Sequence, residues 1–554
     1  MSTQIEILEE AIKAAIERAI ASGALSGTAP EAIKLDRPKD RDHGDYASSI
    51  ALQLAKPAGM NPRDVAVIIA EQLNGVSDIS KVDIAGPGFI NITLNRASQA
   101  ALVETILNAK SDFGKGSSLS GVKINLEFIS ANPTGPLHLG HTRWAAVGDS
   151  LGRVLTAAGA QVTREFYIND RGNQMDLFGQ SVEAVALGNS VPENGYQGDY
   201  IKDLAQEVVA QNSEIKSLPE EERFVEFREA AYKLQLKDQQ RVLDTFNTHF
   251  DVWFSERSLH EQGAVDHGMK KLQAQGHVFE VDGAVWLRTT DFGDDKDRVM
   301  TKSDGSLTYF ASDTAYYINK RERGFDICIY MLGADHHGYI GRLKATAACA
   351  GDDPGYNVEV LIGQLVKIME GGEEVKLSKR AGTIITLEEL VEKVGVDAAR
   401  YTLIRYPVDT PMVMDIDILK RNTNENPVYY VQYAHARIAA VLRNALELGA
   451  SLNLAEFDPS QLVHNRENEL LAALAEFPRV VASAAEFREP HRIARYLEEL
   501  AGTYHGFYND CRVLPMGEEK FTALHTARLL LCTATKQVVH NGLDLLGVSA
   551  PERM

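Results

Sequence analysis

Apolar residues recur at helical spacing at the start of the chain. Residues 1–20 place them on one face, which predicts an amphipathic helix. These apolar positions are Ile5, Leu8, Ile12, Ile16 and Ile20. Residues 61–74 predict a second helix, because Asn61 can cap it and Pro62 fits its first turn.

The next segment has strand character. Residues 82–94 predict two strands joined by a turn, since Gly-Pro-Gly between them is strong turn chemistry. The small, polar stretch 111–121 follows and predicts a domain boundary. We therefore expect an N-terminal α/β domain over residues 1–115.

Beyond this boundary the pattern alternates between strands and helices. Residues 122–129 and 162–168 predict buried strands, and residues 141–159 between them predict a helix. This order is a βαβ unit, the start of a parallel sheet. Residues 325–332 and 359–369 predict further strands of that sheet.

Two long segments are mainly helical in pattern. Residues 185–290 are rich in charged residues at helical spacing and predict an insertion in the sheet domain. From about residue 425 the pattern is helical to the end. We expect a catalytic domain over residues 120–400 and a separate helical bundle over residues 420–554.

Composition adds limits to this picture. No apolar run reaches the roughly 18 residues that a membrane helix needs, and the N-terminus lacks the features of a signal peptide. None of the four cysteines forms a C-x-x-C pair, which disfavours a zinc site or a disulfide framework. We expect a protein of the reducing cytoplasm. The net charge of −20 disfavours a nucleic-acid partner unless basic residues are gathered locally.

The segment EFISANPTGPLHLGHTRWAA, residues 127–146, links the first predicted strand to its helix, where open α/β sheets bind nucleotides. It contains no Gly-rich phosphate loop, but His138 and His141 flank Gly140 at the helix start. Two imidazoles there can donate hydrogen bonds to phosphate oxygens as charge develops. Gly140 would let an adenine ring approach the backbone. The alternative is that H-L-G-H only caps a helix.

HLGH resembles the HIGH motif of class I aminoacyl-tRNA synthetases. The second motif of that class, KMSKS, resembles VKLSKRAGT, in which Lys376, Leu377, Ser378 and Lys379 take the matching places. A lone KLSK is usually solvated surface, but both motifs in this order after predicted strands are far more specific. Lys376 and Lys379 would neutralise the triphosphate as pyrophosphate leaves.

Longer strings narrow the resemblance to the bacterial-type arginyl-tRNA synthetases. They cover nearly the whole chain: ANPTGPLHLGH, FYINDRGNQ, GDDKDRVM, GADHHGYIGRLKA, NPVYYVQYAHARI and LLGVSAPERM. The resemblance implies a multidomain α/β fold. Its parts are a Rossmann-type catalytic core with an inserted helical subdomain, an N-terminal α/β domain and a C-terminal all-α anticodon-binding bundle.

An arginine substrate requires carboxylates, because guanidinium is a planar fork of donors that matches them in pairs. Tyr309 and Asp313 are four residues apart and would share a face of a helix. The resemblance implies that both line the guanidinium end of the pocket, together with Glu256. It also implies arginine contacts from three residues of the first strand and turn: Glu127, Ser130 and Asn132. The alternatives are that Tyr309 is a core residue and that Asp313 is a solvated charge on a helix face.

The resemblance also implies the remaining contacts. Asp335 and His336 would lie near the ATP adenosine, with His138, Gly140, His141, Ser378 and Lys379; adjacent histidines at 336–337 alone are a weak signal for a metal. In the N-terminal domain, Phe89 and Asn91 would hold an unpaired D-loop adenine, although Phe89 could instead be a core residue. Met554 and a tyrosine, Tyr508 or nearby Tyr504, would lie at the anticodon.

The implied reaction is activation of arginine by ATP and transfer to the 2′-hydroxyl of the terminal adenosine of tRNA(Arg). The partners are tRNA(Arg), arginine and ATP with Mg²⁺, and the protein is expected to be a monomer without membrane contact. A tRNA partner for so acidic a chain requires a basic track, which we expect past Lys376 and Lys379 toward Arg437 and Arg443.

Two other functions fit parts of the pattern. A small-molecule adenylating ligase would share the two motifs, but it would have no anticodon to read with NPVYYVQYAHARI. A non-catalytic tRNA-binding relative would share the domains, but the intact histidines and lysines disfavour it. Arginine-dependent ATP–pyrophosphate exchange, with and without tRNA, separates the three.

Overall fold

The computed structural model describes residues 4–38, 43–336, 338–375 and 385–554. In the described part of the N-terminal domain, helices pack against an antiparallel sheet in the order β1-β2-β4-β3. Its helices are α1 (Gln4–Ala21), α2 (Ile50–Ala58) and α3 (Pro62–Leu73), and its strands are β1 (Leu35–Asp36), β2 (Tyr46–Ser48), β3 (Ile79–Ala85) and β4 (Phe89–Leu94). The predicted helices and the strand pair are confirmed, and Asn61 caps α3 by accepting from the Arg63 amide.

The N-terminal domain ends earlier than the sequence indicates. Its core extends from Ile5 to Leu94, whereas Leu102 and Val103 belong to the core of the rest of the molecule. They lie on α4 (Arg96–Ala109), which packs against helices α17 and α20 of the C-terminal bundle. The expected end at residue 115 is therefore wrong. The polar stretch 111–121 is a loop inside the larger body.

The catalytic domain is built on a parallel sheet in the order β12-β11-β5-β6-β7. The strands are β5 (Lys123–Glu127), β6 (Gln161–Ile168), β7 (Val252–Ser255), β11 (Ile327–Gly333) and β12 (Val358–Gly363). Helix α5 (Leu139–Ala157) connects β5 to β6, which confirms the predicted βαβ unit. The strand order reverses between β5 and β11, and ligands of such sheets bind at the carboxyl ends there.

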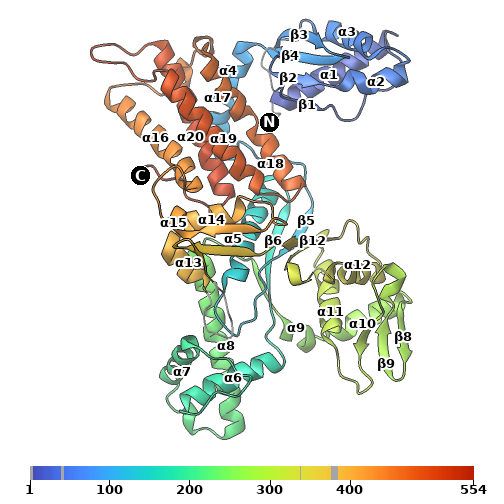
Figure 1. The fold of residues 1–554 in the computed structure, drawn as a ribbon. Coiled ribbons are helices and arrows are strands. Elements are labelled where there is room, and N and C mark those ends of the chain that lie inside the picture. Colours follow the sequence, from blue (N-terminus) through green and yellow to red (C-terminus); the bar gives the residue numbers. More distant parts are fainter. Residues whose placement is uncertain (1–3, 39–42, 337, 376–384) are drawn as a thin grey trace.

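Two lobes leave this sheet and lie apart in Figure 1. The first is helical and has its own core; it comprises α6 (Asn173–Ala186), α7 (Asp199–Gln211) and α8 (Glu220–Thr245). The second comprises α9 (Glu256–Glu261), α10 (Ala264–Ala274), β8 (Val278–Val281), β9 (Ala284–Leu287), β10 (Arg298–Thr301), α11 (Tyr309–Glu322) and α12 (Tyr339–Cys349).

The expected helical insertion over residues 185–290 is thus only partly correct. Helices continue to Thr245, but the chain then returns to the central sheet as β7 and forms the antiparallel strands β8 and β9. Strands of four residues are too short to show a period of two against charged flanks. The charged helical pattern of α8 therefore dominated the interpretation of the whole segment.

A second small sheet, β14-β13-β15, follows the central one. Its strands are β13 (Val366–Glu370), β14 (Glu373–Glu374) and β15 (Met412–Asp415), and the neighbouring helices are α13 (Leu387–Val394), α14 (Val396–Ile404) and α15 (Ile416–Leu419). The single strand expected over residues 359–369 is two strands, β12 and β13. They belong to different sheets.

The C-terminal region is a helical bundle, as predicted (Figure 1). It comprises α16 (Pro427–Glu447), α17 (Asn465–Ala475), α18 (Phe477–Glu486), α19 (His491–Asp510) and α20 (Ala523–Leu545). Its core is continuous with that of the catalytic domain. Within the described ranges, no helix combines the length and apolar character needed to cross a bilayer.

Candidate active site

Two stacked histidines open helix α5 at the end of the loop that follows β5. His138 is the N-cap, and the ring centroids of His138 and His141 are 3.9 Å apart. The Nδ1 atom of His138 accepts from the Gly140 amide at 3.1 Å, and that of His141 accepts from the His138 amide at 3.4 Å. A neutral imidazole that accepts at Nδ1 carries its proton on Nε2. Both rings therefore cap the helix and also present an Nε2 donor.

Gly140 is needed for this arrangement. A Cβ atom at this position would lie 2.9 Å from Cε1 and 3.0 Å from Nδ1 of His138, so any side chain would push the ring away from the helix start. The backbone of Gly140 is exposed. Capping and phosphate donation, posed as alternatives from the sequence, are compatible in one geometry.

The KLSK segment lies outside the described residues, as do Lys376, Leu377, Ser378 and Lys379. The chain on its far side is anchored beside the histidines. The Leu139 amide donates to the Ile385 carbonyl at 3.1 Å, and the Leu387 amide donates to the Leu137 carbonyl at 2.9 Å. Thr386 forms an antiparallel bridge with His138 and caps α13.

The turn after β5 holds the first group of predicted arginine contacts. Ser130 donates to Glu127 at 3.1 Å and accepts from the Tyr167 amide at 3.1 Å. Asn132 is exposed and donates to Gln174 at 2.7 Å. The φ angles of Ile129 and Ser130 are 68° and 44°. A β-branched residue rarely adopts positive φ, so this turn stores strain while it aims Ser130 at Glu127.

Three carboxylates lie in reach of one tyrosine. Glu127, Glu256 and Asp313 all act electrostatically on Tyr167, and burial together with these charges raises the pKa of its hydroxyl well above the usual value. Glu256 is 4% exposed at the start of α9 and hydrogen-bonds to Tyr167. Tyr167 lies in one of the strings that carry the resemblance, but no role was predicted for it. Its position near the three acids is visible only in the folded structure.

Asp313 and Tyr309 lie one turn apart on α11, as predicted. Tyr309 is 70% exposed, so it is not a core residue, while Asp313 is half-buried and accepts a hydrogen bond from Tyr339. Burial, and then the charge of Glu127, raises the pKa of Asp313 to about 6. Burial and the charge of Asp313 likewise raise the pKa of Glu256. Acids with raised pKa values that face one another favour a cationic ligand.

A buried charge network supports these acids from below. Lys320 on α11 is fully buried, pairs with Glu127 and lies over the rings of Tyr316 and Tyr330 at 4.3 and 4.0 Å. Glu165 on β6 pairs with Arg323. The basic residues at the end of α11 have a sequence pattern typical of a solvated helix face. This pattern therefore did not predict that Lys320 is buried.

The predicted adenosine contacts follow β11 at the same edge of the sheet. Asp335 and His336 form a single turn, Ala334–His336, directly after that strand, and His336 is exposed. His337 lies outside the described residues. Within those residues, no group of three or more His, Cys, Asp or Glu side chains is arranged to hold a metal ion.

The predicted RNA contacts lie in the outer domains. Phe89 begins β4 and is 39% exposed, whereas Asn91 on the same strand is 5% exposed. Tyr508 is half-buried under the guanidinium of Arg437, 4.2 Å from its ring centroid, while Tyr504 is fully buried in the bundle. Met554 is 55% exposed. This favours Tyr508 over Tyr504 as a surface contact.

Two further aromatic residues near Arg437, Tyr433 and His505, had no role in the sequence prediction. Tyr433 is exposed and stacks on Tyr429, with their ring centroids 6.0 Å apart. The ring centroid of His505 lies 5.9 Å from that of Tyr433. Exposed aromatic rings beside a guanidinium are suited to unstacked bases.

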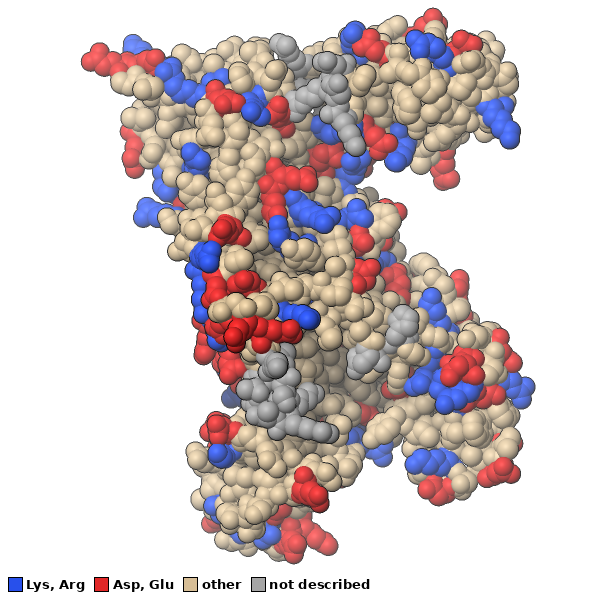
Figure 2. All heavy atoms as spheres, in the orientation of Figure 1, with Lys and Arg blue, Asp and Glu red and all other residues tan. Residues whose placement is uncertain are grey.

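On the face shown in Figure 2, Lys and Arg alternate with Asp and Glu over every domain. Along that face the described residues form no continuous basic track. Arg443, which the sequence placed on the track, is paired with Glu552. The described residues of this face therefore do not support the predicted track.

Three protein-family models match consecutive parts of this chain. Residues 6–94 match the arginyl tRNA synthetase N terminal domain, residues 102–435 the catalytic domain of tRNA synthetases class I (R), and residues 431–554 the DALR anticodon binding domain.

Whole proteins and structures match as well. An arginine–tRNA ligase of Pseudarthrobacter chlorophenolicus is 54% identical over 99% of this chain and 100% of its own length. One of Frankia alni is 54% identical over 99% of both. The arginyl-tRNA synthetase structure from Thermus thermophilus shares the fold with a TM-score of 0.77 at 23% identity, over 99% of this chain and 100% of that one.

Proposed function

This chain belongs to the class I arginyl-tRNA synthetases, and we propose that the residues at the carboxyl ends of β5 and β11 carry out its reaction. The chain is an arginine–tRNA ligase. It activates arginine with ATP and transfers it to the 2′-hydroxyl of the terminal adenosine of tRNA.

In the first step the arginine carboxylate attacks the α-phosphate of ATP, and pyrophosphate leaves. The Nε2 donors of His138 and His141 stabilise the charge that develops on the phosphates. Lys376 and Lys379 neutralise the departing pyrophosphate. The hydrogen bond between Leu139 and Ile385 supports this role, because it ties the chain six residues beyond Lys379 to the helix start. ATP would enter as its Mg²⁺ complex, and the ion would neutralise part of the phosphate charge.

Arginine lies with its guanidinium toward Asp313, Glu256 and Tyr309. Its other end reaches Glu127, Ser130 and Asn132. Fixed acids in a partly buried pocket favour a planar cation over a neutral analogue, because removal of the cation would leave like charges facing one another. Asp335 and His336 are expected to contact the adenosine, together with Gly140.

In the second step the 2′-hydroxyl of the tRNA attacks the arginyl carbonyl, and AMP leaves. The RNA is held at three places. Phe89 and Asn91 receive the D-loop base, Tyr508 and Met554 lie at the anticodon, and the acceptor end reaches the arginyl carbonyl in the catalytic domain. The protein acts as a monomer in the cytoplasm, a location that its four buried free thiols favour.

The observation that carries this assignment is the gathering of Glu127, Glu256 and Asp313 around Tyr167, at the sheet edge that also holds the two histidines. The test is ATP–pyrophosphate exchange with each amino acid, with and without tRNA(Arg). We expect exchange with arginine and none with citrulline. Exchange supported equally by citrulline would contradict the role of the three carboxylates.

A further inference from the structure

A single arginine joins three distant parts of the catalytic domain and bundle. Arg400 on α14 is fully buried, and its guanidinium donates to Asp149 on α5 at 2.7 Å. It also donates to the Leu546 carbonyl at the end of α20 at 3.0 and 3.1 Å. The remaining donors reach the loop after α8, at the Phe246 and Asn247 carbonyls, both at 2.9 Å. The guanidinium therefore has partners on α5, at the end of α20 and in the loop after α8.

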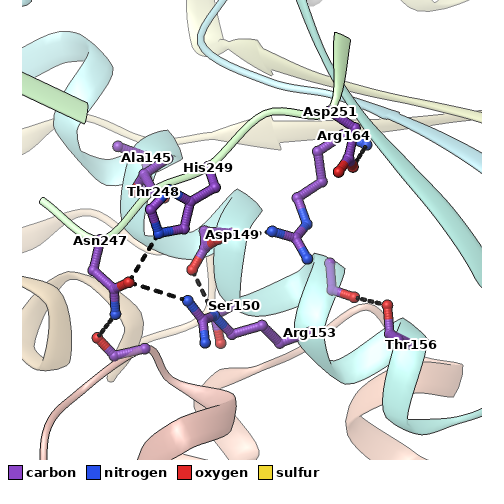
Figure 3. A network of polar contacts seen from close by, with 12 residues as sticks. Ala145, Asp149, Ser150, Arg153, Thr156, Arg164, Asn247, Thr248, His249 and Asp251 are labelled. Atoms are coloured by element: carbon purple, nitrogen blue, oxygen red, sulfur yellow. Dashed lines mark hydrogen bonds and ion pairs between the residues drawn. The ribbon is translucent and has the colours of Figure 1, made fainter. Parts of the chain in front are cut away.

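The last carbonyls of a helix have no partner within it. At the end of α20 they are bound by the catalytic domain. Ser150 on α5 donates to the Leu545 carbonyl at 2.8 Å, and Arg153 on α5 donates to that of Asp544 at 3.3 Å. Asn247 donates to the Gly547 carbonyl at 2.9 Å. Figure 3 shows Arg153 and Asn247 turned toward each other beside the end of α20.

The close approach restricts the sequence at this point. Gly547 has a φ of +65°, and a Cβ atom there would lie 2.3 Å from Nη2 of Arg400. No other residue fits without moving the guanidinium. This glycine belongs to the string LLGVSAPERM, one of those that carry the family resemblance. The active site described above does not explain why a glycine stands there.

The chain beyond Gly547 stays bound to the bundle. Ser549 contacts Asp397 on α14, and Gln432 on α16 donates to the Ser549 carbonyl at 2.9 Å. Glu552 pairs with Lys536 on α20 at 2.6 Å. The end of α20 and the residues after it thus form one continuous connection between the anticodon-binding domain and α5.

Helix α5 is also the helix that begins with the two histidines. Ser150 is nine residues after His141, about 14 Å along the axis at 1.5 Å per residue. A helix of this length moves as a unit, so a displacement at Ser150 reaches the Nε2 donors. A fixed end of α20 therefore fixes the histidines.

We propose that Ser150, Arg153 and Arg400 form a coupling joint, through which the anticodon-binding domain sets the position of α5 and so the rate of adenylate formation. They are positioning residues, because they act through His138 and His141 and do not touch the substrates. The inference rests on the function proposed above. It requires that RNA held by the bundle alters the rate through α20.

The test uses Ser150→Ala, which removes one hydroxyl from the joint and leaves Arg400 in place. The matched control is Thr535→Val, which removes an equally buried hydroxyl that bonds within α20, to the Leu531 carbonyl at 2.8 Å. For Ser150→Ala we expect kcat for arginylation at saturating tRNA(Arg) to fall about three- to tenfold, the value of one hydrogen bond. The KM for arginine should stay within twofold.

A merely structural role would lower the thermal midpoint of both variants alike and leave kcat unchanged in both. That result would overturn the coupling joint. If the proposed function itself fails, the unmodified protein does not arginylate tRNA, which is a different outcome.

A double-mutant cycle gives the second measurement. Tyr508→Ala removes an RNA-facing ring of the bundle, 4.2 Å from Arg437. If its effect on kcat passes through the joint, it should largely disappear in the Ser150→Ala background. Additive effects of Tyr508→Ala and Ser150→Ala on kcat would overturn the proposal.

Discussion

The ammonium of Lys320 lies against the carboxylate of Glu127, and the two side chains are 0% and 11% exposed. Loss of one partner from a buried pair leaves an uncompensated charge and costs ~3–5 kcal/mol of stability. Lys320→Met should therefore lower the thermal midpoint of the protein. It should also raise the KM for arginine, because Glu127 loses the contact that orients it.

The double variant Lys320→Met with Glu127→Gln removes both charges and should recover most of the thermal midpoint. The control is Lys367→Met, whose partner Glu374 is 3.5 Å away in a pair that is 61% and 50% exposed. Exposed pairs contribute little, so this variant should change little. If Lys320→Met were equally silent, the buried pair would not support the pocket.

Asp313→Asn tests the guanidinium end of the pocket. The amide keeps the shape and the hydrogen bond from Tyr339 but removes the charge, which should cost ~2–5 kcal/mol of arginine binding. The KM for arginine should rise, and citrulline should be rejected less strongly. Unchanged discrimination between arginine and citrulline would assign the charge recognition to Glu256.

The same residue predicts a pH dependence. The pKa of Asp313 in the folded protein is about 6, above its ordinary value of 3.8, because burial disfavours the carboxylate. The folded state therefore holds this proton more tightly than the unfolded state does, and the group's contribution to stability falls as pH rises from about 4 through 6. Arginine binding requires the carboxylate and should weaken below about pH 6.

The KM for arginine between pH 5.5 and 8 measures this effect, with Asp313→Asn as the control. The KM of the unmodified protein should rise toward low pH, while that of Asp313→Asn should stay level across the Asp313 titration. In the absence of arginine, Asp313→Asn should raise the thermal midpoint at pH 7.5. A lower midpoint there would mean that the buried charge is already compensated.

His138 has two roles that can be separated. His138→Ala removes both the cap of α5 and the Nε2 donor, and should slow adenylate formation on the order of 10²–10³-fold. His138→Asn restores a good cap without the imidazole donor. It should match His138→Ala in rate and the unmodified protein in thermal midpoint. Full pre-steady-state activation in His138→Asn would limit His138 to capping.

Phe89→Ala tests the N-terminal RNA contact. Stacking on a base depends little on ionic strength, whereas phosphate contacts release counterions and make the logarithm of affinity fall with the logarithm of salt. Phe89→Ala should weaken tRNA(Arg) binding and leave the salt slope unchanged. Val67→Ala is the control, since Val67 is 40% exposed on α3 of the same domain. Equal losses in both variants would remove Phe89 from the interface.

The sequence predicted those parts of the fold that have long periodic patterns or strong turn chemistry. The βαβ unit, α3 with its Asn61 cap and the bundle are examples. It missed β7, because four residues give no measurable period, and it misplaced the first boundary. Nothing local distinguishes a helix that packs on its own domain from one, such as α4, that packs on residues far along the chain.

For the site, motifs identified residues that touch substrates but not those that hold them in place. His138 and Asp313 lie in strings with a chemical meaning. Lys320 and Arg400 do not, because a buried cation has the same sequence appearance as a surface one. Their partners Glu127 and Asp149 are 193 and 251 residues away. Such pairs are fixed by the topology of the sheet and become visible only with the fold.

The packing of α4 against α17 and α20 also has a consequence for how the protein is made. Roughly 400 residues separate α4 from α20, which takes a ribosome about 20–80 s at 5–20 residues per second. Throughout that interval Leu102, Val103 and Ile106 have no bundle to enter, while residues 4–94 already possess a complete core. The nascent chain would thus carry a folded N-terminal domain followed by α4 with an exposed apolar face. Chaperone binding would protect this face until the C-terminal helices are made.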